Sequence, residues 1–87
     1  MSELDASAAR LRWGCRRGML ELDVILVPYF DTCFAALTPE QKTIFERFLE
    51  SDDPDLFAWL MGHDECKDKD LAWMVEQIVA YNKSLLR

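Results

Sequence analysis

Two arginines, a glycine and a glutamate near the N-terminus are the side chains best placed to do chemistry in this chain. Arg16 and Arg17 precede Gly18, and Glu21 follows three residues later. Guanidinium groups pair with carboxylates or phosphates, and a glutamate accepts hydrogen bonds. A glycine among them lets the backbone of another molecule approach closely. We therefore predict that Arg16, Arg17, Gly18 and Glu21 form a partner-binding site.

The same four residues also suit a purely local role. Gly18 can end one helix and begin the next, and Glu21 can then return to the backbone N–H of Gly18, as in a capping box. Spacing alone favours this structural interpretation. The two interpretations are compatible, because a cap can also hold a binding surface in shape.

Metal binding is a weaker prediction at two other clusters. Asp52, Asp53 and Asp55 lack the loop glycine and the distal glutamate of an EF-hand, and helix capping explains them better. His63 and Cys66 lie three residues apart, but a zinc site needs four ligands, and the other cysteines lie far away in the sequence. We expect no metal site.

Catalysis is also disfavoured. The sequence offers no nucleophile paired with a base, no glycine-rich phosphate loop and no carboxylate dyad. One histidine without a positioned second group is poor evidence for acid–base work. We predict that the protein is not an enzyme and that it binds no cofactor stably.

Composition predicts a single small helical domain. The 87 residues are 51% hydrophobic, with only three glycines and three prolines, and β-branched residues are few. We expect one domain over 1–87, with a core at about 8–82 and loosely ordered termini. The net charge of −6 argues against nucleic-acid binding. Four arginines nevertheless crowd one N-terminal segment, where they can orient a protein partner: Arg10, Arg12, Arg16 and Arg17.

The sequence also predicts a soluble, cytoplasmic protein. No basic segment leads into an apolar run as in a secretory signal, and no apolar stretch approaches the ~20 residues that span a bilayer. The three cysteines are widely spaced and odd in number, as suits reduced thiols.

Hydrophobic periodicity and capping residues predict about five helices, hence an all-α bundle. Ser7 should cap the first helix and Gly18 should end it. A second helix has Pro28 inside it, where we expect a kink or a break. Its apolar stripe is Leu22, Ile25, Leu26, Tyr29, Phe30, Cys33, Phe34 and Leu37.

Capping signals place the remaining three helices. Thr38, with Pro39 and Gln41, reads as a capping box. Asp53 should cap a short helix that Gly62 ends, and Asp68 should cap the last one. The last helix should bury a stripe of Leu71, Met74, Val75, Ile78, Tyr81 or Asn82, and Leu85. Of the tryptophans, we expect Trp59 at the core or its edge and Trp13 to contact a partner.

The chain carries two ordered motifs, Cys15-Arg16-Arg17-Gly18-x-x-Glu21-Leu22-Asp23 and Asp52-Asp53-Pro54-Asp55-Leu56-Phe57-x-Trp59-Leu60-Met61. Together they resemble the bacterial succinate dehydrogenase assembly factors, a family of small flavinylation factors with mitochondrial relatives. The resemblance covers about residues 8–82 and includes the spacing between the motifs.

The resemblance implies a five-helix bundle that binds the flavoprotein subunit of succinate dehydrogenase, and in some bacteria that of fumarate reductase. Such a factor promotes covalent attachment of FAD to a histidine of that subunit. The partner carries the FAD, and direct contact with FAD stays open. The family's arginine–glycine–glutamate surface maps to Arg17, Gly18 and Glu21, with Arg16 as a neighbour. We expect a monomer.

Some family members are described as antitoxins. An antitoxin-like regulatory protein of a toxin–antitoxin pair is therefore the alternative function. An autonomous enzyme is the least favoured of the three classes.

Overall fold

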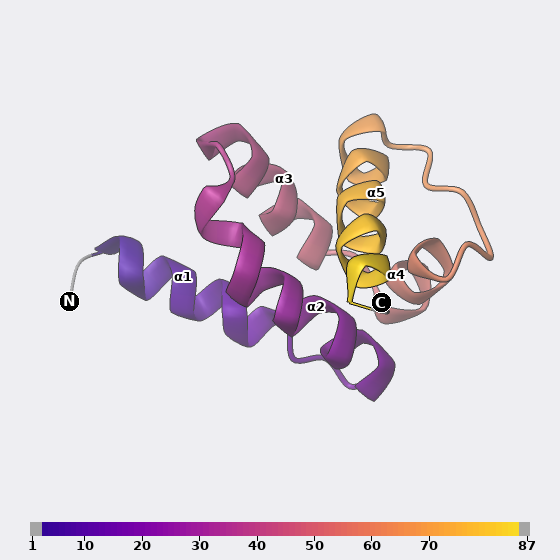
Figure 1. Ribbon diagram of the computed structural model, residues 1–87, viewed down its shortest axis with the longest axis horizontal. Coiled ribbons are helices and arrows are strands. Elements are labelled where there is room, and N and C mark those ends of the chain that lie inside the picture. The colour runs from indigo at the N-terminus through magenta and orange to yellow at the C-terminus, as the bar shows by residue number, and fades with distance from the viewer. Residues whose placement is uncertain (1–2, 86–87) are drawn as a thin grey trace.

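Within the residues that the structure describes, the fold consists of five α-helices and one short 3-10 helix (Figure 1). The structure is a computed structural model that describes residues 3–85, with side chains described from residue 8 onward. No strand occurs within 3–85, so the predicted all-α bundle of five helices is confirmed. The elements are α1 (Glu3–Gly14), α2 (Leu20–Cys33), η1 (Phe34–Ala36), α3 (Pro39–Leu49), α4 (Asp53–Leu60) and α5 (Lys69–Ser84).

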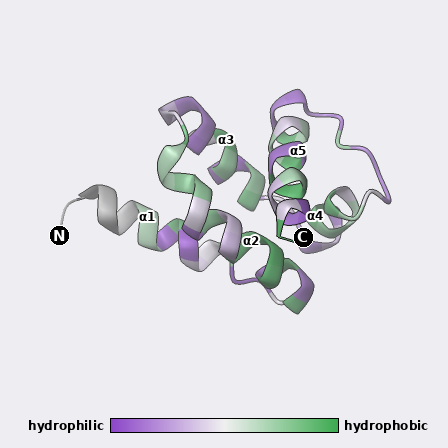
Figure 2. Ribbon diagram, viewed as in Figure 1, coloured by the Kyte–Doolittle hydropathy of each residue, from purple (hydrophilic) through white to green (hydrophobic). Residues whose placement is uncertain are grey.

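Helix α2 lies at the centre of the arrangement and contacts α1, α4 and α5, while α5 also contacts α3 and α4. The chain between α1 and α2 runs back beside α2 to its N-terminal end (Figure 1). Hydrophobic residues concentrate on the packed helices, whereas the long connection between α4 and α5 is mostly hydrophilic (Figure 2). None of the helices in the described chain is long and apolar enough to cross a membrane.

The predicted apolar stripe of α2 supplies much of the core. Six of its eight residues are buried and the other two, Cys33 and Leu37, are partly buried against the cluster. Aromatic rings from α2, η1 and α3 stack there, with Phe30 and Phe34 at a centroid distance of 4.5 Å. The fully buried side chains come from four helices and the first connection, and they are Cys15, Leu22, Leu26, Phe45, Phe48, Leu56, Met74 and Ile78.

Pro28 lies inside α2, yet the helix is continuous from Leu20 to Cys33. Of the expected kink or break, the break is therefore wrong, and the kink stays a prediction. A proline at this position has no N–H for the carbonyl of Val24, four residues earlier, so that carbonyl lacks its helical partner. Packing of the α2 stripe on both sides of Pro28 offsets the lost hydrogen bond.

Three predicted caps are confirmed. Thr38 forms the capping box with Gln41, and Asp68 accepts hydrogen bonds from the backbone N–H groups of Asp70 and Leu71. Gly62 has φ of 76° and follows the C-cap of α4. The N–H groups of Gly62 and His63 donate to the carbonyls of Trp59 and Ala58, which is a Schellman motif.

Four other predictions about the ends of helices are wrong. Helix α1 begins at Glu3 and ends at Gly14, so Ser7 lies within it and Gly18 does not end it. Asp52, not Asp53, occupies the N-cap of α4, and it makes no side-chain cap bond. Leu85 is 54% exposed because α5 ends at Ser84. Of the termini expected to be loosely ordered, outside about 8–82, residues 3–7 belong to α1 and 83–84 to α5, whereas 1–2 and 86–87 lie outside the described residues.

Candidate partner-binding surface

The α1–α2 junction, residues 15–19, is held against α2 and α4 by side chains from distant parts of the chain. Helix α1 is tied to α2 by Arg12, whose Nε donates to Asp31 Oδ1 at 2.7 Å. The pKa of Asp31 is lowered because it accepts hydrogen bonds from Arg12. Both side chains of this ion pair are exposed to solvent, so the pair contributes little to stability.

Arg17 anchors the junction. Its side chain is 17% exposed and turns into the fold, where Nε lies 2.7 Å from Asp53 Oδ1. The terminal guanidinium nitrogens donate to three backbone carbonyls, at 3.0 Å to Gly14, 2.8 Å to Leu49 and 2.9 Å to Ser51. One side chain thus joins the end of α1, the end of α3 and the start of α4.

The positive charge of Arg17 complements the partial negative charge at the C-terminal ends of α1 and α3. Carbonyls at the C-terminus of a helix lack intrahelical donors and carry partial negative charge. Gly14 and Leu49 are the last residues of α1 and α3, and both of their carbonyls accept from Arg17. The ion pair with Asp53 also explains why the arginine motif and the later aspartate motif occur together. Sequence reasoning missed this pair because it assigned Asp53 to helix capping.

Asp23 is the second anchor that the sequence did not reveal. Its Oδ1 accepts a hydrogen bond from the backbone N–H of Arg17. The N-cap position of α2 is Met19, which makes no side-chain cap bond, so Glu21 is only the second helical residue. The predicted capping box between Gly18 and Glu21 is therefore wrong. The carboxylate of Asp23 holds the connection instead.

Gly18 stands exposed at the junction, and the fold itself places little demand on it. Its φ lies outside the left-handed region. A Cβ built there would meet nothing nearer than Asp53 Oδ2 at 3.9 Å, which is ordinary contact. A side chain at this position would therefore extend into solvent from a well-anchored backbone.

The other predicted site residues divide into two groups. Arg16 and Glu21 are exposed, and neither makes a side-chain hydrogen bond or ion pair with the described part of the chain. Arg17 is instead committed to contacts inside the fold. Trp13, which we expected to contact a partner, is 75% exposed at the end of α1. Trp59 packs at the edge of the core, as predicted.

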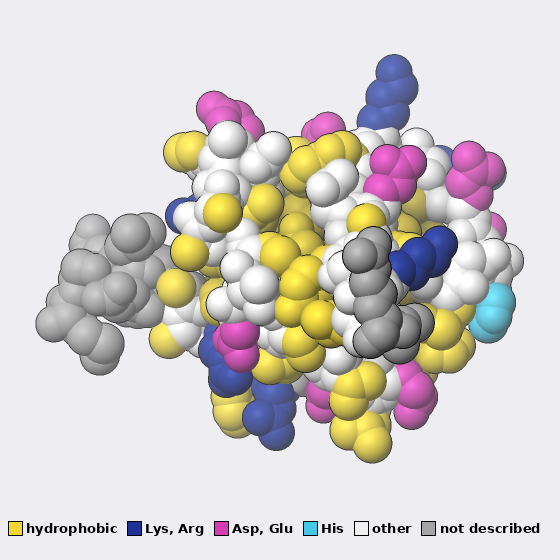
Figure 3. All heavy atoms as spheres, viewed as in Figure 1, with side chains coloured by type: hydrophobic (Ala, Val, Ile, Leu, Met, Phe, Trp, Pro, Cys, Tyr) yellow, Lys and Arg dark blue, Asp and Glu magenta, His cyan; other side chains and the backbone are white. Residues whose placement is uncertain are grey.

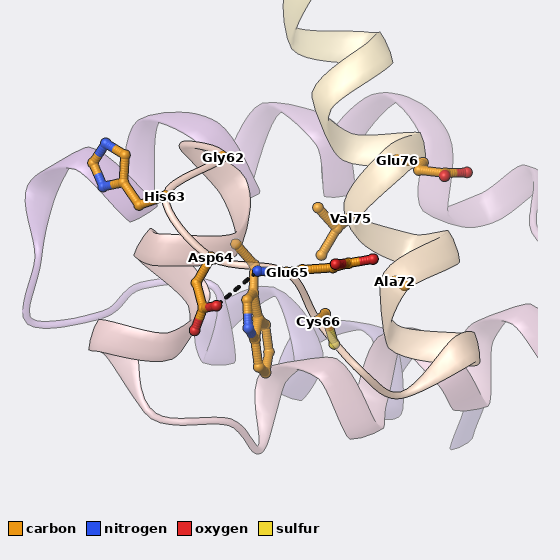
Figure 4. Close-up of a pocket in the computed structure, with 9 residues that line it drawn as sticks. Gly62, His63, Asp64, Glu65, Cys66, Ala72, Val75 and Glu76 are labelled. Atoms are coloured by element: carbon orange, nitrogen blue, oxygen red, sulfur yellow. Dashed lines mark hydrogen bonds between the residues drawn. The ribbon is translucent and has the colours of Figure 1, made fainter.

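The region around His63 and Cys66 is a hollow of about 500 Å³ between α5 and the chain that precedes it (Figure 4). The imidazole of His63 points away from Cys66, so the two do not converge on a common point (Figure 4). Within the described chain, no group of three or more histidine, cysteine or acidic side chains is arranged to hold a metal ion.

This hollow does not fit FAD either. Three carboxylates line it, those of Asp64, Glu65 and Glu76. Their charge would repel the pyrophosphate of a dinucleotide, which proteins usually bind with backbone N–H groups and cations. The donor set therefore gives no reason to place the cofactor on this part of the molecule.

Cys15 is a structural residue of the junction. Its side chain is fully buried and its thiol lies 3.4 Å from the carbonyl of Leu11. Burial raises the pKa of the thiol to about 12, so it stays protonated near neutral pH. The three cysteines are all free.

Comparison with known proteins assigns the family. The sequence profile of the family described as "flavinator of succinate dehydrogenase" matches residues 9–82. This chain belongs to the succinate dehydrogenase flavinator family. The predicted resemblance is thereby confirmed, and so are its limits at about residues 8–82. The family consists of assembly factors rather than enzymes.

Individual relatives support the flavinator assignment over nearly the whole chain. The FAD assembly factor SdhE of Vibrio cholerae is 57% identical over 79 residues, covering 91% of this chain and 92% of the relative. SdhE of Vibrio parahaemolyticus is 52% identical with the same coverage. The solution structure of a protein called UPF0350 superposes with a TM-score of 0.78 at 53% identity, covering all of this chain and 92% of that one.

Proposed function

We propose that this protein binds the flavoprotein subunit of succinate dehydrogenase through the α1–α2 junction and promotes covalent attachment of FAD to that subunit. Family membership supports the reaction, because the family is that of the succinate dehydrogenase flavinators. The exposed Gly18 supports the location. It leaves a bare stretch of anchored backbone that the fold does not require to be glycine.

The chain needs no catalytic residue for this role. Flavinylation joins FAD to a side chain of the flavoprotein, which supplies the reacting group and its surroundings. A helper need only bind best to the flavoprotein conformer in which the two groups can react. A tenfold increase in that conformer requires about 1.4 kcal/mol of differential affinity. A small interface can supply that much and still release its product.

Several finer features belong to the same proposal. We propose that FAD stays with the flavoprotein and that this chain acts as a single domain and a monomer. The flavoprotein subunit of fumarate reductase is a second partner that the resemblance implies. The three free cysteines suit action in the cytoplasm, where thiols stay reduced.

The four site residues take different parts in this proposal. Arg16, Gly18 and Glu21 are exposed and would touch the partner. Arg17 would act as a positioning residue, because its guanidinium is occupied by Asp53 and three backbone carbonyls. In this proposal Arg17 fixes the shape of the surface, and Arg16 supplies its exposed positive charge.

A bulky substitution at the glycine tests the location. We expect Gly18→Arg to abolish covalent FAD incorporation into the flavoprotein, measured by flavin fluorescence in denaturing gels, while the circular dichroism spectrum stays that of the wild type. Ala80→Arg is the matched control, because Ala80 is a small exposed residue on α5. Full flavinylation with Gly18→Arg would show that the interface lies elsewhere.

Removal of the glutamate separates binding from folding. Glu21 makes no hydrogen bond with the described residues, so Glu21→Ala should change the free energy of unfolding by less than about 0.5 kcal/mol. The same change should weaken capture of the flavoprotein. A loss of stability without a loss of binding would return Glu21 to a structural role.

A further inference from the structure

A groove beside the junction offers a second contact region that the arginine–glycine–glutamate motif does not include. It lies between the junction and the outer face of α2, and we call it the α2 groove. Its volume is about 340 Å³, and most of its surface is apolar. The lining residues are Arg16, Leu20, Asp23, Val24, Val27 and Pro28.

The apolar part of this groove is unusually exposed. Leu20 is 70% exposed and Val24 is 59% exposed, although both lie on the helix that supplies most of the core. Positions 20, 24, 27 and 28 recur at intervals of four, three and one, so they share one side of α2. The buried stripe of α2 occupies the opposite side. Helix α2 therefore has two apolar faces, and the fold covers one of them.

Pro28 leaves a backbone carbonyl on this face without its usual helical donor. Because a proline has no N–H, the carbonyl of Val24 makes no hydrogen bond to the residue four positions later. A carbonyl that lacks this helical donor, beside exposed aliphatic side chains, can accept a hydrogen bond from a donor of another molecule. The groove thus combines apolar contact with one directional hydrogen bond.

The charge at the edge of the groove indicates what the occupant carries. Arg16 is exposed and its guanidinium makes no ion pair with the described residues. Asp23 also lines the groove, but its Oδ1 already accepts from the backbone of Arg17. Arginine side chains lie directly beside hydrophobic ones on the side of the molecule formed by α1 and α2, which contain no lysine (Figure 3). Arg16 is the one cation among the residues that line the groove, so a side chain that pairs with it must be anionic.

We infer that the α2 groove receives a segment of the flavoprotein that presents an aliphatic or aromatic side chain next to a carboxylate. The apolar side chain packs on Leu20 and Val24, and the carboxylate pairs with Arg16. This inference rests on the proposed function, because the groove continues the surface that begins at Gly18. It extends the interface by two turns along α2, beyond the motif.

The test measures affinity for the purified flavoprotein subunit of succinate dehydrogenase with the full chain. Leu20→Asp and Val24→Asp should each raise the dissociation constant at least about tenfold, because they place a charge in an apolar contact. Both positions are exposed, so folding should be preserved, as circular dichroism would verify. Met61→Asp is the matched control, since Met61 is 41% exposed at the end of α4.

Arg16→Gln tests the charge separately. The wild-type affinity should fall as ionic strength rises, and this variant should show a weaker dependence on salt. Unchanged affinity for Leu20→Asp and Val24→Asp would overturn the groove inference. If Gly18→Arg still abolished binding in the same assay, the proposed function would stand without it.

Two other outcomes also decide the matter. If the wild type fails to bind the flavoprotein at all, the proposed function fails and the groove inference fails with it. If sedimentation shows that the wild type self-associates and Val24→Asp abolishes only that, the occupant is a second copy of this chain. That result would overturn the assignment to the flavoprotein.

Discussion

The two glycine-bearing connections of this protein are built on opposite principles. The α4–α5 junction, residues 61–68, takes its backbone shape from neighbours in sequence: Gly62 adopts φ of 76° in a Schellman motif, and Asp68 caps the helix that follows. Its one long-range ion pair in the described chain is the exposed pair of Asp68 with Arg47 of α3. The α1–α2 junction is organised from a distance. Arg17 reaches residues up to 36 positions away, and Gly18 adopts no special backbone conformation.

This difference is the reason why we propose a structural role for Gly62 and a binding role for Gly18. Gly62 is explained by the turn that it makes, so no partner is needed to account for it. Gly18 is not explained by its own fold, because its φ is ordinary and space is available for a side chain. The fold has room for a side chain at Gly18, yet the residue is glycine. A rigid surface with such a bare position suits the docking of another protein.

Removal of the long-range anchor should have the largest effect on stability. Arg17→Ala would leave Asp53 and three carbonyls without their donor, at a cost of about 3 kcal/mol in the free energy of unfolding. Urea denaturation would measure it, with Arg16→Ala as the matched control at less than about 0.5 kcal/mol. Equal midpoints for the two variants would remove the anchor from the account.

Alanine at the two glycines should give results of opposite sign. Gly62→Ala forces a side chain into the left-handed region and should cost about 1 to 2 kcal/mol. Gly18→Ala restricts the unfolded chain without strain, so stability should be unchanged or rise by up to about 0.5 kcal/mol. Thermal unfolding of both variants would reveal the difference, and a large loss at Gly18 would make it a structural glycine.

The cysteines of the two junctions should differ in reactivity. Cys15 is fully buried with its pKa raised to about 12, whereas Cys66 is partly exposed. At pH 8 a thiol reagent should modify Cys66 at least about tenfold faster than Cys15. Mass spectrometry of single-cysteine variants would give both rates, and rapid modification of Cys15 in the folded protein would mean that the junction opens.

Acid should weaken the α4–α5 junction slightly. The pKa of Asp68 is lowered because its carboxylate accepts from the backbone N–H of Leu71 and from Arg47. The contribution of this charge is present above the ordinary carboxyl pKa of about 4 and is lost as pH falls through the lowered value.

An Asp68→Asn variant isolates that charge, since asparagine can still cap the helix. Its urea midpoint should fall below that of the wild type at pH 7, and the gap should narrow at pH 3. A gap that stays constant with pH would assign the effect of Asp68 to geometry alone.

Sequence patterns predict the parts of this fold that depend on near neighbours. The capping box at Thr38, the stop at Gly62, the cap at Asp68 and the buried stripe of α2 all follow from residues within one or two turns. The start of α1, which lies at Glu3 and not after Ser7, carries no comparably strong signal.

The anchors of the candidate site were not predictable in the same way. Asp53 looks like a helix cap because proline follows it, and Arg17 looks free because arginines usually lie on the surface. The contact between them spans 36 residues and depends on how α1, α3 and α4 converge. The resemblance to a family proposed the site, and the structure divides the proposed residues between anchoring and exposure.

One measurement tests the central claim most directly: nuclear magnetic resonance of the isotopically labelled protein during titration with the flavoprotein subunit of succinate dehydrogenase. The account predicts that the backbone signals of Arg16, Gly18 and Val24 shift or broaden first, while those of Gly62 and His63 stay unchanged. Changes centred on the α4–α5 junction, with the α1–α2 junction undisturbed, would contradict it.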